Sequence, residues 1–149
     1  AARHMENAAG ADFALSVALL DVDHFKKIND GHGHGVGDQA LISLAGTASE
    51  IVRAEGGEEA VFGRIGGEEF LLLLPDFTIG QTAALGEKLR NAAGAIDVRG
   101  ESGTFRFTIS LGVASLADHD RSFDTLVARA DAALYEAKNR GRNQVVVAA

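Results

Sequence analysis

The sequence contains no cysteine, which excludes disulfide bonds and thiolate metal sites. No apolar run approaches the roughly 18 residues of a membrane-spanning helix, and the N-terminus lacks a signal-peptide pattern. Basic residues are few, 14 against 21 acidic ones, and the net charge is −7. Because a nucleic-acid surface needs a basic patch, we expect no nucleic-acid partner. Because the segment has no spanning run, we also expect it to make no membrane contact. We expect a cytoplasmic location, with any membrane anchor of a longer parent protein outside this segment.

The chain of 149 residues has the length of one domain with a substantial core. Residues 1–12 are small and polar without an amphipathic period, and His4-Met5 is compatible with a remnant of an expression vector. We therefore set residues 1–15 apart as an N-terminal segment and expect a single domain over residues 16–149.

A predicted hairpin forms the centre of the chain. Residues 61–65 and 70–74 favour extended structure, and Gly66-Gly67 between them predicts a two-residue turn. Glu68 and Glu69 come directly after that turn, and a stable hairpin does not need acids there. Taken alone, the pair is better explained as a solvated hairpin tip, because short motifs match by accident.

Residues 16–20 (SVALL) form a nearly continuous apolar run, which predicts a strand buried on both faces and thus a central one. Asp21 and Asp23 lie at its end. A carboxylate with the neighbouring carbonyl of Val22 is a partial site for a hard cation such as Mg²⁺. Asp23 has a second interpretation, as the N-cap of a short helix from Phe25.

Residues 31–37 (GHGHGVG) predict a glycine loop, succeeded by a helix from Asp38 to just before Gly56. Asp38 is therefore also a candidate cap of that helix. The spacing of His32 and His34 is not a recognised zinc pattern.

Later elements complete the pattern. Thr78 and Gln81 predict a capping box that opens a helix to about residue 93, and residues 105–114 alternate strictly as one strand after a turn at 100–103. A helix from Phe123 ends in the basic residues 138–142, with Gly141 suited to a left-handed cap, and residues 144–147 form a last strand. The order predicts one α+β domain whose helices pack on a mainly antiparallel sheet.

If the strands at 16–21 and 68–74 are neighbours, then Asp21, Glu68 and Glu69 converge at one end of the sheet. Three carboxylates so close repel one another unless cations lie among them. Two-metal phosphoryl or nucleotidyl transfer requires such a cluster.

Other polar residues suit the same chemistry. Lys26, Lys138 and Arg142 could neutralise phosphates, although a capping role also explains Lys138. Asn29 and Asp38 offer the mixed donors and acceptors that favour the edge of guanine.

Five motifs occur in order along the chain: residues 21–30 (DVDHFKKIND), 33–38 (GHGVGD), 64–70 (RIGGEEF), 110–114 (SLGVA) and 130–143 (ADAALYEAKNRGRN). Together they resemble the GGDEF domain of bacterial diguanylate cyclases over about residues 16–147. The resemblance implies a palm-like α+β fold of the nucleotidyl cyclase type. It also implies a reaction in which two GTP become cyclic di-GMP and two pyrophosphates, with Mg²⁺ as cofactor, two ions per site, and Mn²⁺ as a substitute.

In this family each domain binds one GTP, and two domains meet antiparallel, which implies a homodimer that forms transiently in the isolated domain. The matching metal-binding positions are Asp21, the Val22 carbonyl, Glu68 and Glu69, and the motif does not divide metal binding from proton abstraction between the two glutamates. The matching positions for substrate are Asn29, His34 and Asp38 at the guanine, Lys26, Lys138 and Arg142 at the phosphates, and Gly66 and Gly67 where the triphosphate approaches the turn.

Two family features are missing. Many relatives carry Arg-x-x-Asp before the signature as a product-inhibition site, whereas residues 57–60 here are GEEA. We therefore expect no such feedback. The D-x-L-T turn that precedes the first strand in relatives is also missing, with Arg3 as a candidate remnant of the residues that come after that turn. We accordingly expect an upstream sensory domain to lie outside this chain.

Because every expected catalytic position is filled, we expect an active diguanylate cyclase. Two alternatives stay open. One is a catalytically silent module that binds GTP or cyclic di-GMP and regulates a partner domain. The other is a nucleotidyl cyclase of the same fold with a different product, against which Asn29 and Asp38 argue.

Overall fold

The computed structural model describes residues 14–117 and 119–149, so most of the N-terminal segment, residues 1–13, lies outside the description. The elements in chain order are β1 (Leu15–Val22), α2 (Phe25–His32), α3 (His34–Glu55), β2 (Val61–Gly66), β3 (Glu69–Pro75), α4 (Ile79–Gly94), β4 (Val98–Gly100), β5 (Gly103–Phe105), β6 (Ile109–Ser115), α5 (Phe123–Asn139) and β7 (Val145–Val147).

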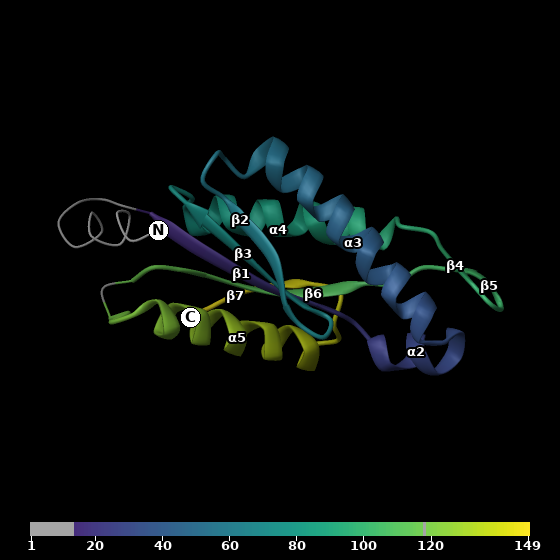
Figure 1. Ribbon diagram of the computed structural model, residues 1–149. Helices are drawn as coiled ribbons and strands as arrows, with labels where there is room; N and C mark the ends of the chain where they lie inside the picture. The colour runs from purple at the N-terminus through teal and green to yellow at the C-terminus, as the bar shows by residue number, and fades with distance from the viewer. Residues whose placement is uncertain (1–13, 118) are drawn as a thin grey trace.

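A five-stranded sheet in the order β2-β3-β1-β6-β7 carries the domain. All neighbouring strands are antiparallel except β6 and β7, which are parallel. Figure 1 shows α3 and α4 on one face of this sheet and α5 on the other. The predicted α+β class with a mainly antiparallel sheet is confirmed.

Strand β1 is the central strand, as its continuous apolarity predicted. Every one of its residues is buried. Because helices cover both faces of the sheet, neither side of this strand meets water, and an alternating pattern would have placed polar groups in a core. The strand therefore runs straight from one end of the domain to the other and delivers Asp21 at its far end.

The prediction of one alternating strand over residues 105–114 is wrong. Residues 103–105 pair with β4 in a separate two-stranded hairpin, and β6 begins only at Ile109. Its small residues are buried like its large ones, because α5 packs directly on the backbone there: a Cβ on Gly112 would lie 2.2 Å from both the Ala130 oxygen and the Leu134 nitrogen. Large and small residues alternate along β6, but buried and exposed residues do not, so the period of two in the sequence did not indicate a strand with one exposed face.

The glycine-rich stretch 31–37 is not a loop, contrary to the prediction. Helix α2 continues to His32, and α3 begins at His34, so that Gly33 alone forms the junction with a φ of 90°. Asp38 lies inside α3 and is not its cap, because Gly33 occupies the N-cap position. The N-cap of α2 is His24 rather than Asp23. The two helices thus form a tight elbow beside the end of β1.

Helix starts elsewhere agree with the sequence signals. Thr78 and Gln81 form the predicted capping box of α4, and Ser122 caps α5 through the Thr125 amide. Beyond α5, Gly141 adopts a φ of 116°, as a left-handed residue after a helix end should. No helix among the described residues combines the length and the apolarity that crossing a membrane requires.

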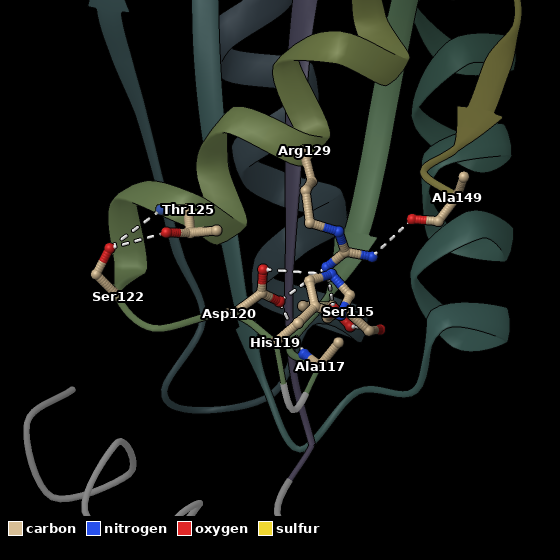
Figure 2. Close-up of polar contacts among 9 residues, drawn as sticks. Ser115, Ala117, His119, Asp120, Ser122, Thr125, Arg129 and Ala149 are labelled. Carbon is tan, nitrogen blue, oxygen red and sulfur yellow. Dashed lines mark hydrogen bonds and ion pairs between the residues drawn. The ribbon is translucent and has the colours of Figure 1, made fainter.

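The end of the sheet opposite Asp21 has a polar cluster of its own, drawn in Figure 2. The side chain of Asp120 is fully buried and accepts hydrogen bonds from Arg129 at 2.8 Å and from the Ala117 amide at 2.8 Å. Arg129 also donates to the carbonyl oxygens of Ser115 at 2.8 Å and Ala149 at 3.1 Å. These bonds tie the start of α5 to the ends of β6 and the chain.

Candidate functional site

The register of the central strands brings the predicted carboxylates together. Asp21 at the end of β1 lies opposite Glu69 on β3 and opposite Ser110 on β6. The Val22 amide donates to the Glu68 carbonyl at 3.3 Å, which places the signature turn against the end of β1. The conditional prediction that these strands are neighbours is therefore confirmed, and the three acids lie at one end of the sheet.

The turn differs by one residue from the prediction. Gly66 pairs with Glu69 as the last residue of β2, so the two turn residues are Gly67 and Glu68 rather than Gly66 and Gly67. A bulge at Ile65 shifts the register, since one extra residue on β2 must be accommodated. Arg64 donates its Nε to the Gly67 oxygen at 2.6 Å and holds the turn closed. Glu68 consequently sits in the turn itself, while Glu69 belongs to the strand.

The glycines of the turn are not explained by packing. A Cβ on Gly66 or Gly67 would meet no atom within 4 Å, and only Gly67, with a φ of 44°, has a backbone that favours glycine. Gly66 could carry a side chain as far as the fold is concerned. The space next to it is therefore open to a molecule that approaches the backbone closely.

Lys138 occupies the centre of the acidic cluster. It lies in the last turn of α5 and forms an ion pair with Asp21 through Nζ and Oδ2. Asp21 is only 5% exposed, and its other oxygen, Oδ1, is buried without a hydrogen-bond partner in residues 14–117 and 119–149. The lysine ammonium lies beside the carboxylate and offsets part of its charge.

The electrostatics of the site favour a bound cation. Burial raises the pKa of Asp21 above its ordinary value, even though the Lys138 ammonium opposes the shift, and the Glu68 and Asp23 charges add to it. Burial likewise raises the pKa of Glu69, with further contributions from the charges of Asp21 and Asp131. Burial and neighbouring negative charges thus keep the pKa values of Asp21 and Glu69 raised, and Lys138 does not offset them.

Asp131 is a member of this cluster that the sequence reasoning missed. It is an exposed residue of α5, seven positions before Lys138, and its charge acts on Glu69. Residues seven apart lie on one helix face, which is the sequence signal that could have identified it.

The oxygen donors of the acidic cluster fit a hard divalent cation, but protein side chains in the described part of the chain do not surround such an ion alone. No group of three or more His, Asp or Glu side chains in residues 14–117 and 119–149 is arranged to hold a metal by itself. Mg²⁺ needs fewer protein ligands than that, because it usually keeps several waters and shares substrate phosphates. The unpartnered Asp21 oxygen, the Val22 carbonyl and the two signature glutamates provide oxygen donors of the right kind.

The elbow of α2 and α3 carries the residues predicted for a base. Asn29 packs its side chain against Gly37, where a Cβ would lie 1.9 Å from Asn29 Oδ1, and Asp38 is the next residue of α3. Asn29 Oδ1 is buried without a hydrogen-bond partner within the described part of the chain. Asp38 and His34 are exposed on the same helix. Asn29 therefore lies against the residue that precedes Asp38, and His34 lies one turn before Asp38.

The predicted phosphate-binding residues are spread over two elements. Lys26 is exposed in the first turn of α2. Arg142 is exposed beyond α5, where its Nη1 donates to the Lys138 carbonyl at 3.5 Å. Lys138 and Arg142 thus lie together at the end of α5, whereas Lys26 belongs to α2 and has no ion pair among the described residues.

A mainly antiparallel sheet with helices on both faces, and acids at one strand end beside a lysine, define a domain of the nucleotidyl cyclase type. Comparison with known families is specific. Residues 1–144 match the family described as "Diguanylate cyclase, GGDEF domain", and the chain belongs to this family. The family implies a divalent cation and GTP as substrate.

Individual relatives agree. The chain is 44% identical over 133 residues to Diguanylate cyclase DgcM of Escherichia coli and 35% identical over 133 residues to Diguanylate cyclase A of Treponema denticola, with 89% of this chain covered in both. It spans only 30% and 35% of the length of these two relatives.

Solved structures support the fold over nearly the whole chain. The match to the active GGEEF domain of a diguanylate cyclase from Vibrio cholerae covers 99% of this chain and 90% of that domain's chain, at a TM-score of 0.87 and 30% identity. The match to the GGDEF domain of DgcB from Caulobacter crescentus, solved in complex with c-di-GMP, covers 97% of this chain and 84% of that domain's chain, at a TM-score of 0.83 and 30% identity.

Proposed function

We propose that this domain is an active diguanylate cyclase, which condenses two GTP into cyclic di-GMP and releases two pyrophosphates. The observation that carries the proposal is the pairing of Asp21 with Glu69 across β1 and β3, beside the Glu68 turn and Lys138. A hairpin tip with no chemical role would not need a buried carboxylate facing it from the neighbouring strand. The alternative of a silent module is less well supported because no acid of the signature is lost.

Each residue of the site has a role in this proposal. Asp21, the Val22 carbonyl, Glu68 and Glu69 would hold two divalent cations, Mg²⁺ or Mn²⁺. When bound, the cations acidify the attacking 3′-hydroxyl and neutralise the departing pyrophosphate. The open space at Gly66 and Gly67 admits the triphosphate close to the backbone.

Substrate recognition would come from the helices around the sheet end. Asn29 and Asp38 fit the edge of guanine, and His34 lines the approach to it. Lys26, Lys138 and Arg142 would neutralise the phosphates, so Lys138 must leave Asp21 when nucleotide and metal bind.

The reaction needs two domains. The 3′-oxygen of one GTP attacks the α-phosphorus of the other, the bond to pyrophosphate breaks, and the hydroxyl proton passes to a signature glutamate or to water. A homodimer in which two sites face each other antiparallel performs this step twice. Such a dimer can form transiently.

The Glu69→Gln variant tests the proposal. It keeps the shape of the side chain and removes its charge, so we expect turnover to fall by about a hundredfold or more. Wild-type protein incubated with GTP and Mg²⁺ should yield cyclic di-GMP at a rate that rises more steeply than linearly with protein concentration. Glu50→Gln, on the exposed side of α3, is the matched control. Full activity in Glu69→Gln would contradict the mechanism, and GTP binding without any product in the wild type would favour a regulatory module.

A further inference from the structure

A buried hub at Asp23 joins the end of β1 to the loop after α5. Asp23 lies two residues beyond Asp21 and is equally buried, at 5% exposure. Its oxygens accept hydrogen bonds from Ser110 Oγ at 2.6 Å, Thr108 Oγ1 at 2.7 Å and the Asn143 amide at 3.0 Å. Both oxygens are therefore engaged, unlike those of Asp21.

The loop that Asp23 holds has a conformation that needs support. Gly141, Arg142 and Asn143 have φ values of 116°, 65° and 49°, three successive residues in the left-handed region. Arginine in particular adopts this region at a cost, so the surrounding contacts must fix it. The Asn143 amide donates to Asp23 and also to Ser110 Oγ at 3.1 Å. Arg90 donates to the Asn143 side chain at 2.9 Å on the other side.

This loop carries Arg142 and lies directly after Lys138, the two cations placed at the phosphates by the proposed function. Asp23 itself is buried, and its oxygens face protein donors, so it does not reach substrate. From this geometry we propose that Asp23 is a positioning residue, which fixes the left-handed loop so that Arg142 meets the nucleotide phosphates beside the β1 carboxylate. The inference rests on the proposed function, because it assigns the loop to GTP.

Two substitutions separate geometry from charge. Asp23→Ala removes the acceptor of the Asn143 amide and frees the loop. Asp23→Asn keeps one carbonyl oxygen for that amide, and its NH₂ group can donate to the Ser110 hydroxyl, so the loop stays in place. Asp120→Ala is the matched control, because Asp120 is also a buried, hydrogen-bonded carboxylate but lies at the opposite end of the sheet.

The probe is 3′-deoxy-GTP with Mg²⁺, which lacks the attacking hydroxyl and reports binding without turnover. We expect its Kd to rise about tenfold in Asp23→Ala, the size of one lost charge-assisted contact, and to stay within about threefold in Asp23→Asn. In a protein that already carries Arg142→Ala, adding Asp23→Ala should not raise the Kd for 3′-deoxy-GTP any further. Amide exchange at Asn143 should accelerate in Asp23→Ala and stay slow in Asp23→Asn. Asp120→Ala should change neither the Kd nor exchange at Asn143.

Several results would overturn the inference. The first is an unchanged Kd for 3′-deoxy-GTP in Asp23→Ala, and the second is a rise in Kd on Asp23→Ala that is the same with and without Arg142. The third is a large rise in Kd in Asp23→Asn while the Asn143 amide still exchanges slowly. The last result remains decisive if Asp23→Ala does not fold, because it would show that Asp23 acts through its charge. Failure of the wild type to bind the probe would instead refute the proposed function, and so the two failures are distinguishable.

Discussion

Replacing Lys138 with methionine should have opposite effects on the affinity for metal and on the affinity for nucleotide. The Lys138 ammonium is bonded to Asp21, and under the proposed function a cation must displace it to reach that carboxylate. The side chain of Lys138 is 32% exposed, so the bond belongs at the weak end of charge-assisted hydrogen bonds, about 1.5 kcal/mol. Removing the competitor should therefore strengthen metal binding about tenfold. GTP binding should weaken, because a proposed phosphate contact is lost.

Titration with Mn²⁺, monitored by electron paramagnetic resonance, measures the metal affinity without nucleotide. A second titration with 3′-deoxy-GTP measures the nucleotide affinity. Lys88→Met is the control, since Lys88 also forms an ion pair, with Glu55, but on exposed parts of α4 and α3. It should leave both affinities unchanged. If Lys138→Met binds Mn²⁺ no better than the wild type, the ammonium does not compete for Asp21, and the reasoning fails.

Four further predictions rest on particular contacts. Burial raises the pKa values of Asp21 and Glu69 in the folded protein above their ordinary values of 3.8 and 4.5. Protonation of these carboxyls therefore favours the folded state, and this stability is fully present below the ordinary values and is lost as pH rises through the folded-state pKa values. Asp21→Asn should thus raise the Tm of the metal-free protein at pH 7 and have little effect at pH 3, by calorimetry. Gly37→Ala displaces Asn29 and should weaken GTP binding about tenfold, whereas Gly35→Ala, with open space around it, should not. Gly112→Ala drives a Cβ into the backbone of α5 and should cost about 3 kcal/mol, read as a lower Tm, with Gly46→Ala as control. Added cyclic di-GMP should not slow the initial rate, because residues 57–60 lack the Arg-x-x-Asp motif and acids such as Glu58 and Asp76 line the hollow between residues 57–59 and 75–77.

The sequence was sufficient for the central strand and the acids at its end. Continuous apolarity over residues 16–20 means burial on both faces wherever it occurs, so the position of Asp21 could be inferred without knowledge of its neighbours. Helix α5 and the capping box at Thr78 were also predictable, because their signals lie within a few residues. Local patterns are informative where the structure they describe is local.

The errors occurred where distant groups decide the local structure. The structure of residues 31–37 depends on contacts between elements: a Cβ on Gly37 of α3 would strike Asn29 of α2, and a Cβ on Gly100 in the hairpin of β4 and β5 would lie 2.3 Å from the His32 ring. The bulge at Ile65 likewise depends on pairing with β3. No pattern within residues 31–37 or 61–66 contains this information.

Asp21 and Asp23 show why burial alone does not identify a functional acid. They are two residues apart in one sequence motif and equally buried. Asp23 meets neutral donors from residues 85, 87 and 120 positions away, which occupy both of its oxygens. Asp21 meets one partly exposed lysine, and its Oδ1 has no hydrogen-bond partner in the part of the chain that the structure describes. Asp23 has fixed neutral donors on both oxygens, which suits a structural role, whereas the partner of Asp21 is a partly exposed lysine that, under the proposed function, gives way to a metal. The partners, more than the depth, separate the two roles.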